Sequence, residues 1–228
     1  MTYEMKVIAR IRSDFDTKFG VPRQSGLVNS AVSRIVFEPE YRNADALRGL
    51  DGFSHLWLIW VFSEAVREGW SPTVRPPRLG GNTRMGVFAT RSPFRPNAIG
   101  LSSVEIEGVE NDPALGPVIL VRGADLMNGT PILDIKPYLP YTDSHPDARG
   151  GFAFGPGEGA VEVVFPEKLL SLIPVEKREA LIEVLSQDPR PGYQRENGRK
   201  YGISYAGFDV RFTVTDSVLE VCEVIGKA

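Results

Sequence analysis

The sequence predicts a mainly β fold: an N-terminal β domain followed by a small C-terminal α+β domain. Short apolar or alternating segments recur up to about residue 135 with little helix between them, which favours a β-barrel or a β-sandwich over a parallel α/β sheet. The segment 147–159, DARGGFAFGPGEG, is rich in glycine and has the composition of a linker. We therefore divide the chain into a β domain at 1–146, a linker at 147–159 and a C-terminal domain at 160–228.

The first part of the chain contains most of the expected strands. Residues 5–11 alternate between two faces, which predicts a half-buried strand. A second strand is expected at 31–37, and Asn43 is a suitable cap for a short helix. The run FSHLWLIWVF at 53–62 is the most apolar of the chain, so it predicts a central strand buried on both faces. Further strands are expected at 85–90, 99–109, 117–122 and 132–135.

The pattern changes after the linker. A strand is expected at 160–165, a helix near Pro166, and a second helix from Pro174 with Leu181, Val184 and Leu185 on one face. An alternating strand follows at 208–215, with a turn at Asp216 and Ser217. The tail is therefore predicted to be a small α+β unit that ends in a β-hairpin.

Composition bounds the possible functions. The 228 residues carry a formal net charge of -3, and no run of about 18 apolar residues or signal-peptide pattern is present. We expect a cytoplasmic protein without a membrane segment. One cysteine, Cys222, excludes an internal disulfide framework, and only two histidines accompany it, so a metal site is not expected. No G-x-G-x-x-G motif follows a strand, which leaves a Rossmann nucleotide site without support.

One stretch, residues 75–100, carries five arginines and no acid, since the flanking carboxylates are Glu68 and Glu105. Four prolines and four glycines indicate a shaped loop. Guanidinium groups form bidentate hydrogen bonds with phosphate and carboxylate, so such a loop is suited to an anionic partner such as nucleic acid. Scattered arginines that merely solvate a surface are the alternative interpretation.

Two further positions carry polar groups in unusual settings. Arg23 and Gln24 follow Pro22 in a loop with little apolar content, where a functional role and a polar turn are both open. His55 is the only ionisable side chain of the 53–62 run, and it is either a core histidine or a site residue at the start of that strand.

Several blocks together resemble the TsaA/TrmO family of tRNA methyltransferases. The blocks are FGVPRQSGLVNS, LRGLDGFSHLWLIWVF, RPPRLGGNTRMGVFATRSPFRPNAIGLS, GADLMNGTPILDIKPYLPY and DPRPGY. The resemblance implies an N-terminal β-barrel of the TsaA type that binds S-adenosylmethionine (SAM), and a homodimer. It also implies methylation of N6 in N6-threonylcarbamoyladenosine at position 37 of threonine tRNA.

The same resemblance assigns the cofactor-binding residues. They fall on the loop that begins at residue 22, the start of the 53–62 run, the arginine stretch, residue 101 directly after it, and the turn after residue 124. At position 128 of that turn, Asn stands where relatives often carry Asp. In this sequence the cofactor-binding residues are Pro22, Arg23, Gln24, His55, Leu56, Arg91, Leu101, Asp125, Leu126, Met127, Asn128, Gly129 and Thr130.

Chemistry adds candidates for catalysis and for tRNA binding. An acylated N6 is a poor nucleophile until its proton leaves, so a base is expected, and the candidates are His55, Asp125 and Asp134. Asp134 could equally form a structural ion pair with Lys136. The predicted tRNA-binding residues are basic or aromatic: Arg75, Arg78, Arg84, Arg95, Lys136, Tyr138 and Arg190.

Two other function classes are compatible with the sequence. A non-catalytic SAM- or RNA-binding barrel would bind without turnover. A methyltransferase with the same cofactor and a different acceptor would leave position 37 unchanged.

Overall fold

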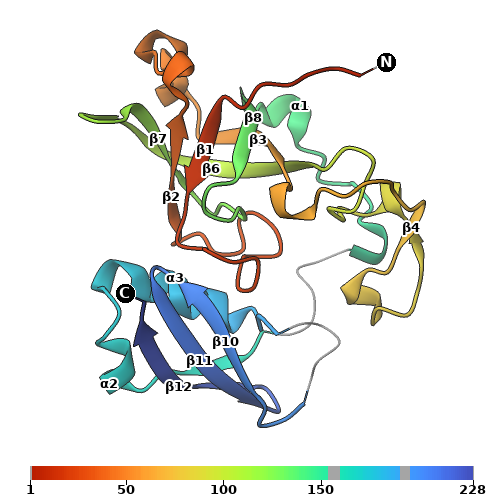
Figure 1. The fold of residues 1–228 in the computed structure, drawn as a ribbon, viewed down its shortest axis with the longest axis vertical. Helices are drawn as coiled ribbons and strands as arrows, with labels where there is room; N and C mark the ends of the chain where they lie inside the picture. The colour runs from red at the N-terminus through yellow and green to blue at the C-terminus, as the bar shows by residue number, and fades with distance from the viewer. Residues whose placement is uncertain (1, 154–159, 191–195, 228) are drawn as a thin grey trace.

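The computed structural model describes residues 2–153, 160–190 and 196–227. Its N-terminal part is a six-stranded sheet that closes on itself in the order β1-β2-β7-β6-β3-β8, with antiparallel neighbours (Figure 1). These strands are β1 (Ala9–Arg12), β2 (Val32–Phe37), β3 (His55–Val61), β6 (Ile99–Asp112), β7 (Gly116–Arg122) and β8 (Pro131–Pro137). The predicted mainly β class is confirmed.

Strand β3 does not have two buried faces, as the sequence had indicated. Leu56, Leu58 and Trp60 are buried and point into the closed sheet, whereas the residues between them are only partly covered. A closed antiparallel sheet has one inner face, so a strand in it buries every second side chain. Burial on both faces was therefore a wrong prediction for 53–62.

The first strand is shorter than predicted. Ala9 and Ile11 are fully buried and alternate with exposed arginines, but Met5 is 55% exposed and precedes the strand. The register with β2 ends at the pair Ala9 and Phe37, and one further hydrogen bond, from the Glu38 amide to the Ile8 carbonyl, follows it. At Asn43, the predicted cap is present: its side chain accepts a hydrogen bond from the Asp45 amide, and a 3-10 helix follows at Ala44–Leu47.

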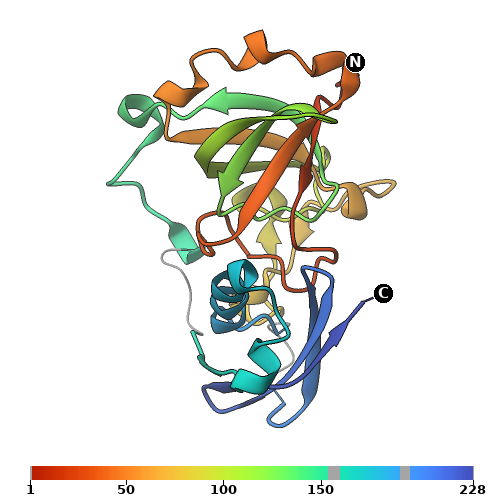
Figure 2. The ribbon, with the colours of Figure 1, turned by 90° about the vertical axis from the view of Figure 1, so that its left-hand side faces the viewer.

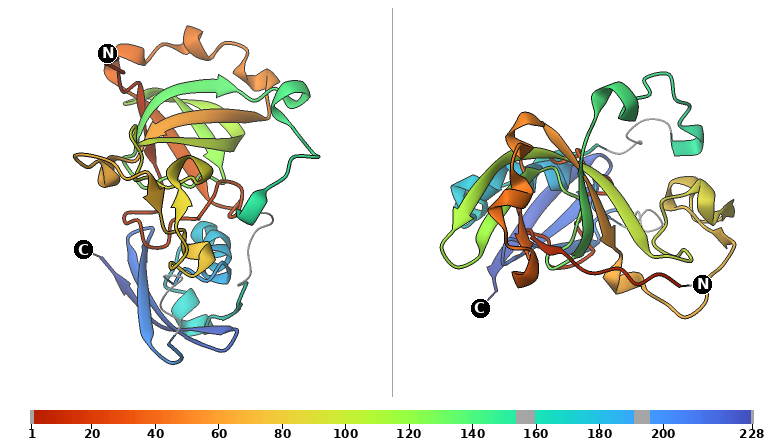
Figure 3. Two further views of the ribbon diagram at one scale, coloured as in Figure 1. Left: turned by 90° about the vertical axis from the view of Figure 1, so that its right-hand side faces the viewer. Right: turned by 90° about the horizontal axis from the view of Figure 1, so that it is seen from above.

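The segment 63–98 projects to one side of the closed sheet, in yellow in the right-hand view of Figure 3. It holds a two-stranded sheet of β4 (Thr73–Val74) and β5 (Met85–Gly86). The strand predicted at 85–90 is therefore wrong beyond Gly86, because a 3-10 helix at Val87–Ala89 replaces it. The Thr90 hydroxyl and amide both donate to the Val87 carbonyl and tighten this turn.

The C-terminal unit is a four-stranded sheet in the order β10-β11-β12-β9 with two helices. Its elements are β9 (Glu162–Val164), α2 (Glu167–Leu170), α3 (Val175–Ser186), β10 (Lys200–Tyr205), β11 (Phe208–Thr215) and β12 (Val218–Gly226). The predicted apolar face of α3 is confirmed, since Leu181, Val184 and Leu185 are buried. The turn at Asp216 joins β11 to β12, as predicted. Strand β10 was not anticipated.

The loop 13–31 lies between the closed sheet and the C-terminal unit (Figure 2). Phe15, Val28 and Ala31 belong to the same buried core as Leu181 and Phe212 of the C-terminal unit. The closed sheet has a separate core of its own. The loop is thus covalently part of the first unit and packs in the core of the second.

Between the two units the described chain includes the short helices α1 (Pro140–Asp143) and η7 (Gly151–Ala153). The rest of the glycine-rich segment, 154–159, lies outside the described residues. Every helix in the described part of the chain is too short or too polar to span a lipid bilayer.

Candidate functional site

A chain of three side chains links the inner face of the closed sheet to the turn after β7. Trp60 Nε1 donates to Ser102 Oγ at 3.0 Å, and Ser102 Oγ donates to Asp125 Oδ1 at 2.6 Å. Ser102 is 2% exposed, so this link is inside the protein. Gly100 makes room for it, because a Cβ at that position would lie 2.3 Å from the Trp60 ring. The link fixes the position of the Asp125 carboxyl.

The Asp125 carboxyl has a perturbed acidity. Burial raises the pKa of Asp125 above its ordinary value, and the hydrogen bond from Ser102 and the positive charge of Arg91 offset only part of this effect. Asp125 is partly buried, and a partly buried carboxyl with a raised pKa in a polar cluster is typical of functional sites.

Arg91 and the loop after Pro22 lie next to this carboxyl. Arg91 Nη1 donates to Gln24 Oε1 at 2.5 Å, and the Gln24 amide nitrogen donates to the Arg23 carbonyl. Pro22 is buried, whereas Arg23, Gln24 and Arg91 are exposed. The fold therefore brings together three of the predicted cofactor positions, Gln24, Arg91 and Asp125, from distant parts of the sequence.

Arg23 contacts the C-terminal unit. Its Nη2 donates to the Asp188 carbonyl at 2.9 Å and to the Arg190 carbonyl at 3.4 Å. The Asp188 carboxylate in turn binds Arg190 through two hydrogen bonds of 2.8 Å. Arg190 is 6% exposed, so a direct tRNA contact, as predicted from sequence, does not fit its position. Pro191, Gly192 and Tyr193 of the same motif lie outside the described residues.

The turn 125–130 is held against the loop 13–31. The Asn128 side-chain oxygen accepts a hydrogen bond from the Ser13 backbone amide. The backbone amide of Asn128 donates to the Phe15 carbonyl at 2.8 Å. Leu126 and Thr130 are buried, Met127 is partly covered, and Gly129 adopts a φ of 80° that favours glycine. The side chains of Leu126 and Thr130 are thus part of the packing.

The other predicted positions lie elsewhere. His55 is on the outer side of β3, where its Nδ1 is 2.9 Å from Ser54 Oγ and its ring is 6.0 Å from that of Tyr138. Leu56 is fully buried in the sheet's core, and Leu101 is 52% exposed opposite Ile59. Asp134 is also opposite Ile59, and it forms the ion pair with Lys136 that was the alternative to a catalytic role, at 2.9 Å.

Within one chain, the predicted site therefore separates into two groups. The first is the polar cluster of Gln24, Arg91, Ser102 and Asp125. The second includes His55 and Leu101 on the outer face of the sheet. Sequence reasoning missed Ser102 and Trp60, because a serine and a tryptophan in strands carry no signal of function until the register of β3 and β6 is known.

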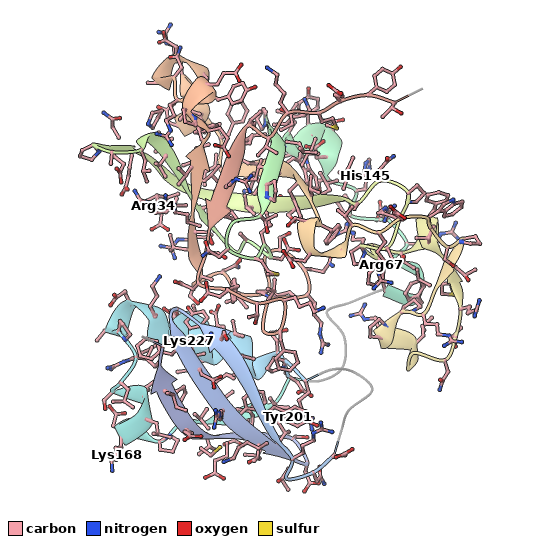
Figure 4. The ribbon with its side chains drawn as sticks, viewed as in Figure 1. Arg34, Arg67, His145, Lys168, Tyr201 and Lys227 are labelled. Atoms are coloured by element: carbon pink, nitrogen blue, oxygen red, sulfur yellow. The ribbon has the colours of Figure 1, made fainter. Side chains whose placement is uncertain are left out.

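Most of the arginine stretch lies within the projecting segment 63–98. Arg75, Arg78 and Arg84 are exposed on it, and Arg84 donates to the Thr73 hydroxyl at 3.5 Å. Arg95 is partly buried and donates to the Thr90 carbonyl at 3.1 Å, so it also supports the loop. Arg67, labelled in Figure 4, lies over the Phe94 ring at 4.0 Å. The surface is basic and partly aromatic, as expected for contact with nucleic acid.

Two family models cover most of the chain. One, described as the tRNA-methyltransferase O N-terminal domain, matches residues 10–144, and one described as the TrmO C-terminal domain matches residues 160–227. An Escherichia coli K12 protein named tRNA (adenine(37)-N6)-methyltransferase is 47% identical over 231 residues, which span 96% of this chain and 97% of the relative. A Pseudomonas aeruginosa protein, provisionally named as an S-adenosylmethionine-dependent methyltransferase, is 41% identical over 93% of each chain.

The fold also matches a solved structure. The crystal structure of TrmO from P. aeruginosa superposes with a TM-score of 0.81 at 36% identity and covers 99% of this chain and 98% of that one. Fold and site thus define a two-part, mainly β protein with a polar cluster where its closed sheet meets the C-terminal unit. The chain belongs to the tRNA-methyltransferase O family.

Proposed function

We propose that this chain is an S-adenosylmethionine-dependent methyltransferase that methylates N6 of adenosine 37 in tRNA. The named activity of the E. coli relative, which matches nearly the whole chain, supports this assignment. The observation in the structure that carries the proposal is the cluster of Gln24, Arg91 and Asp125, in which the positive charge of the guanidinium acts on a partly buried carboxyl.

The residues of this cluster fit the cofactor. The methionine part of SAM carries a carboxylate, for which the Arg91 guanidinium is a suitable donor. The Gln24 side-chain oxygen accepts a hydrogen bond from Arg91 and so holds the guanidinium in place. When bound, SAM supplies an electrophilic methyl group. Orientation of donor and acceptor is then the main task of the protein.

The finer substrate that we propose is N6-threonylcarbamoyladenosine in threonine tRNA. Its N6 lone pair is delocalised into the carbamoyl group, so a base must accept the N6 proton. Asp125 is the candidate that we favour, because its raised pKa makes it a stronger base than an ordinary aspartate and Ser102 fixes its orientation. The ion pair with Lys136 makes Asp134 a weaker candidate.

The tRNA is proposed to bind along the projecting segment through Arg75, Arg78 and Arg84. These arginines lie in a stretch without carboxylates, which suits a phosphate backbone. Tyr138, whose ring is next to that of His55, could stack on an unpaired base, and Lys136, opposite Trp57 on β8, adds a positive charge to this second group.

We further propose that the enzyme works as a homodimer. The predicted residues His55 and Leu101 lie on the outer face of the sheet, whereas Asp125 binds Ser102 of the inner face. A pocket that uses all of them needs a second copy. Sedimentation should give a dimer at micromolar concentration, and a monomer with full activity would contradict a shared site.

The division into domains at 1–146, 147–159 and 160–228 also remains our proposal. Its main support is the presence of two hydrophobic cores. Because tRNA is the proposed substrate, we expect the enzyme to act in the cytoplasm.

The decisive experiment is transfer of a radiolabelled methyl group from SAM to threonine tRNA. Fully modified tRNA should accept the label, and the same transcript without the threonylcarbamoyl group is the control. Binding of SAM and tRNA without product would indicate a non-catalytic protein. An unchanged position 37 in tRNA from a deletion strain, analysed by mass spectrometry, would indicate a different acceptor.

A further inference from the structure

The C-terminal unit contacts the loop 13–31 at several separate points. Glu183 of α3 accepts hydrogen bonds from the Ser30 amide at 3.2 Å and from its hydroxyl at 2.7 Å. Lys177 forms an ion pair with Asp14 at 2.6 Å, and the Ala206 amide donates to the Asp14 carbonyl. Together with the buried Phe15 and Val28, these contacts hold both ends of the loop.

The middle of the loop is held by the residues that follow α3. Asp188 has a φ of 47°, a left-handed conformation that stops the helix and that Asp and Asn tolerate better than most residues. Its amide donates to the Leu185 carbonyl, so the turn is tied to the helix end. Its own carbonyl and that of Arg190 are the two acceptors for Arg23.

The side chains of Asp188 and Arg190 fix those carbonyls. Their two hydrogen bonds of 2.8 Å form a paired guanidinium–carboxylate contact, and both residues are buried. Burial alone would raise the pKa of Asp188, but the hydrogen bonds and charge of Arg190 outweigh it, and the pKa is lowered. The carboxylate is therefore charged at neutral pH and bound to its partner.

A single residue, Arg23, separates this contact from Gln24 of the candidate cofactor site. Arg23 is held by the C-terminal unit, its carbonyl accepts from Gln24, and Gln24 binds Arg91. The order of contacts is thus Asp188–Arg190, then Arg23, then Gln24, then Arg91.

We infer that the C-terminal unit is a positioning element for the cofactor site, in which the Asp188–Arg190 pair holds Arg23 and so sets the place of Gln24 beside Arg91. This inference rests on the proposed SAM site, but not on the identity of the methyl acceptor. Asp188 and Arg190 act through Arg23 and are not catalytic residues.

The test is the Asp188→Asn variant of the full chain. Asparagine keeps the tolerance for the left-handed backbone and removes the charge. We expect the Kd for SAM, measured by calorimetry without tRNA, to rise roughly tenfold. The KM for SAM should rise in parallel, whereas kcat at saturating SAM should stay within about twofold, since the pair touches no reacting atom. A matched control is Asp216→Asn, an exposed left-handed aspartate in the turn between β11 and β12.

Hydrogen exchange provides a readout independent of SAM. In Asp188→Asn, amides of the loop around 23–26 should exchange faster, while those in the middle of α3 should match the wild type. If Asp188→Asn does not fold, Arg190→Lys, which keeps the charge and loses the paired geometry, takes its place. Unchanged SAM affinity and unchanged loop exchange would overturn the inference, as would equal acceleration throughout the C-terminal unit. If the wild type binds SAM but does not methylate tRNA, only the proposed reaction fails.

Discussion

Gln24 and Arg91 are 67 residues apart in the chain, and Arg91 Nη1 donates to Gln24 Oε1 at 2.5 Å. This contact connects the loop 13–31, which the C-terminal unit holds, with the arginine stretch that precedes β6. The Arg91 hydrogen bond goes to an uncharged amide, so the positive charge of Arg91 acts on the partly buried Asp125 carboxyl through space.

Arg91→Ala should weaken SAM binding at least tenfold, about 1.4 kcal/mol, because the carboxylate of the cofactor loses its guanidinium donor. Isothermal titration without tRNA measures this directly. Arg75→Ala, in the same stretch and exposed, should leave SAM affinity unchanged. Equal affinities of Arg91→Ala and the wild type would remove Arg91 from the cofactor site.

Asp125→Asn should abolish most of the methyl transfer while leaving SAM bound, because the amide cannot accept the N6 proton. In the wild type, kcat should fall as pH decreases through the pKa of Asp125, which burial raises above 3.8. The loss of activity thus begins at a higher pH than for an exposed aspartate. The pH dependence of kcat at saturating SAM measures this loss. A kcat that stays constant toward low pH would show that another group accepts the N6 proton.

The same substitution has an expected effect on stability. A carboxyl whose pKa is raised in the folded state destabilises that state when it is ionised at neutral pH. Asp125→Asn should therefore melt at the same temperature as the wild type or higher at pH 7. A clearly lower melting temperature would indicate that the negative charge is needed for folding.

Gly100→Ala should destabilise the protein by about 1–3 kcal/mol, because the added Cβ would lie 2.3 Å from the Trp60 ring and the core must shift. The shift should also disturb the Trp60–Ser102–Asp125 link and reduce activity. Gly108→Ala, in the same strand and without neighbours within 4 Å of an added Cβ, is the control. Chemical denaturation gives the free energy of unfolding of both variants. Equal losses of stability in Gly100→Ala and Gly108→Ala would contradict the proposed role of Gly100.

Arg78→Ala and Arg84→Ala should weaken tRNA binding and leave SAM affinity unchanged. Each lost phosphate contact should lower the slope of log affinity against log salt by about 1. Lys168→Ala provides a comparison, since Lys168 lies in the C-terminal unit, far from the projecting segment (Figure 4). A salt dependence that matches the wild type would argue against an electrostatic contact at these arginines.

Local patterns in the sequence predicted much of the fold. Alternation identified the buried faces of β1 and β11, and the spacing of Leu181, Val184 and Leu185 identified the buried face of α3. These features depend on a few neighbouring residues. Burial of one face or both faces of β3 depends on the closure of the sheet, which is a long-range property. For that reason the prediction that both faces are buried was wrong.

Only some members of the candidate site were predicted from the sequence. The family resemblance pointed to Gln24, Arg91 and Asp125 but not to Ser102, and the contacts among them follow from how β6, the turn 125–130 and the loop 13–31 meet. The charge of Arg190 suggested an RNA contact, whereas Asp188, two residues before it, buries and pairs it. A one-dimensional pattern does not show whether a cation faces solvent or an internal partner.

Phe15, Val28 and Ala31, which lie in the core of the C-terminal unit, have a consequence for unfolding. Two units that each had a complete core would melt independently, whereas here neither can lose its structure without exposing apolar side chains of the other. Calorimetry should therefore give one cooperative transition. A chain that ends at residue 146 should show exposed hydrophobic surface and a tendency to aggregate.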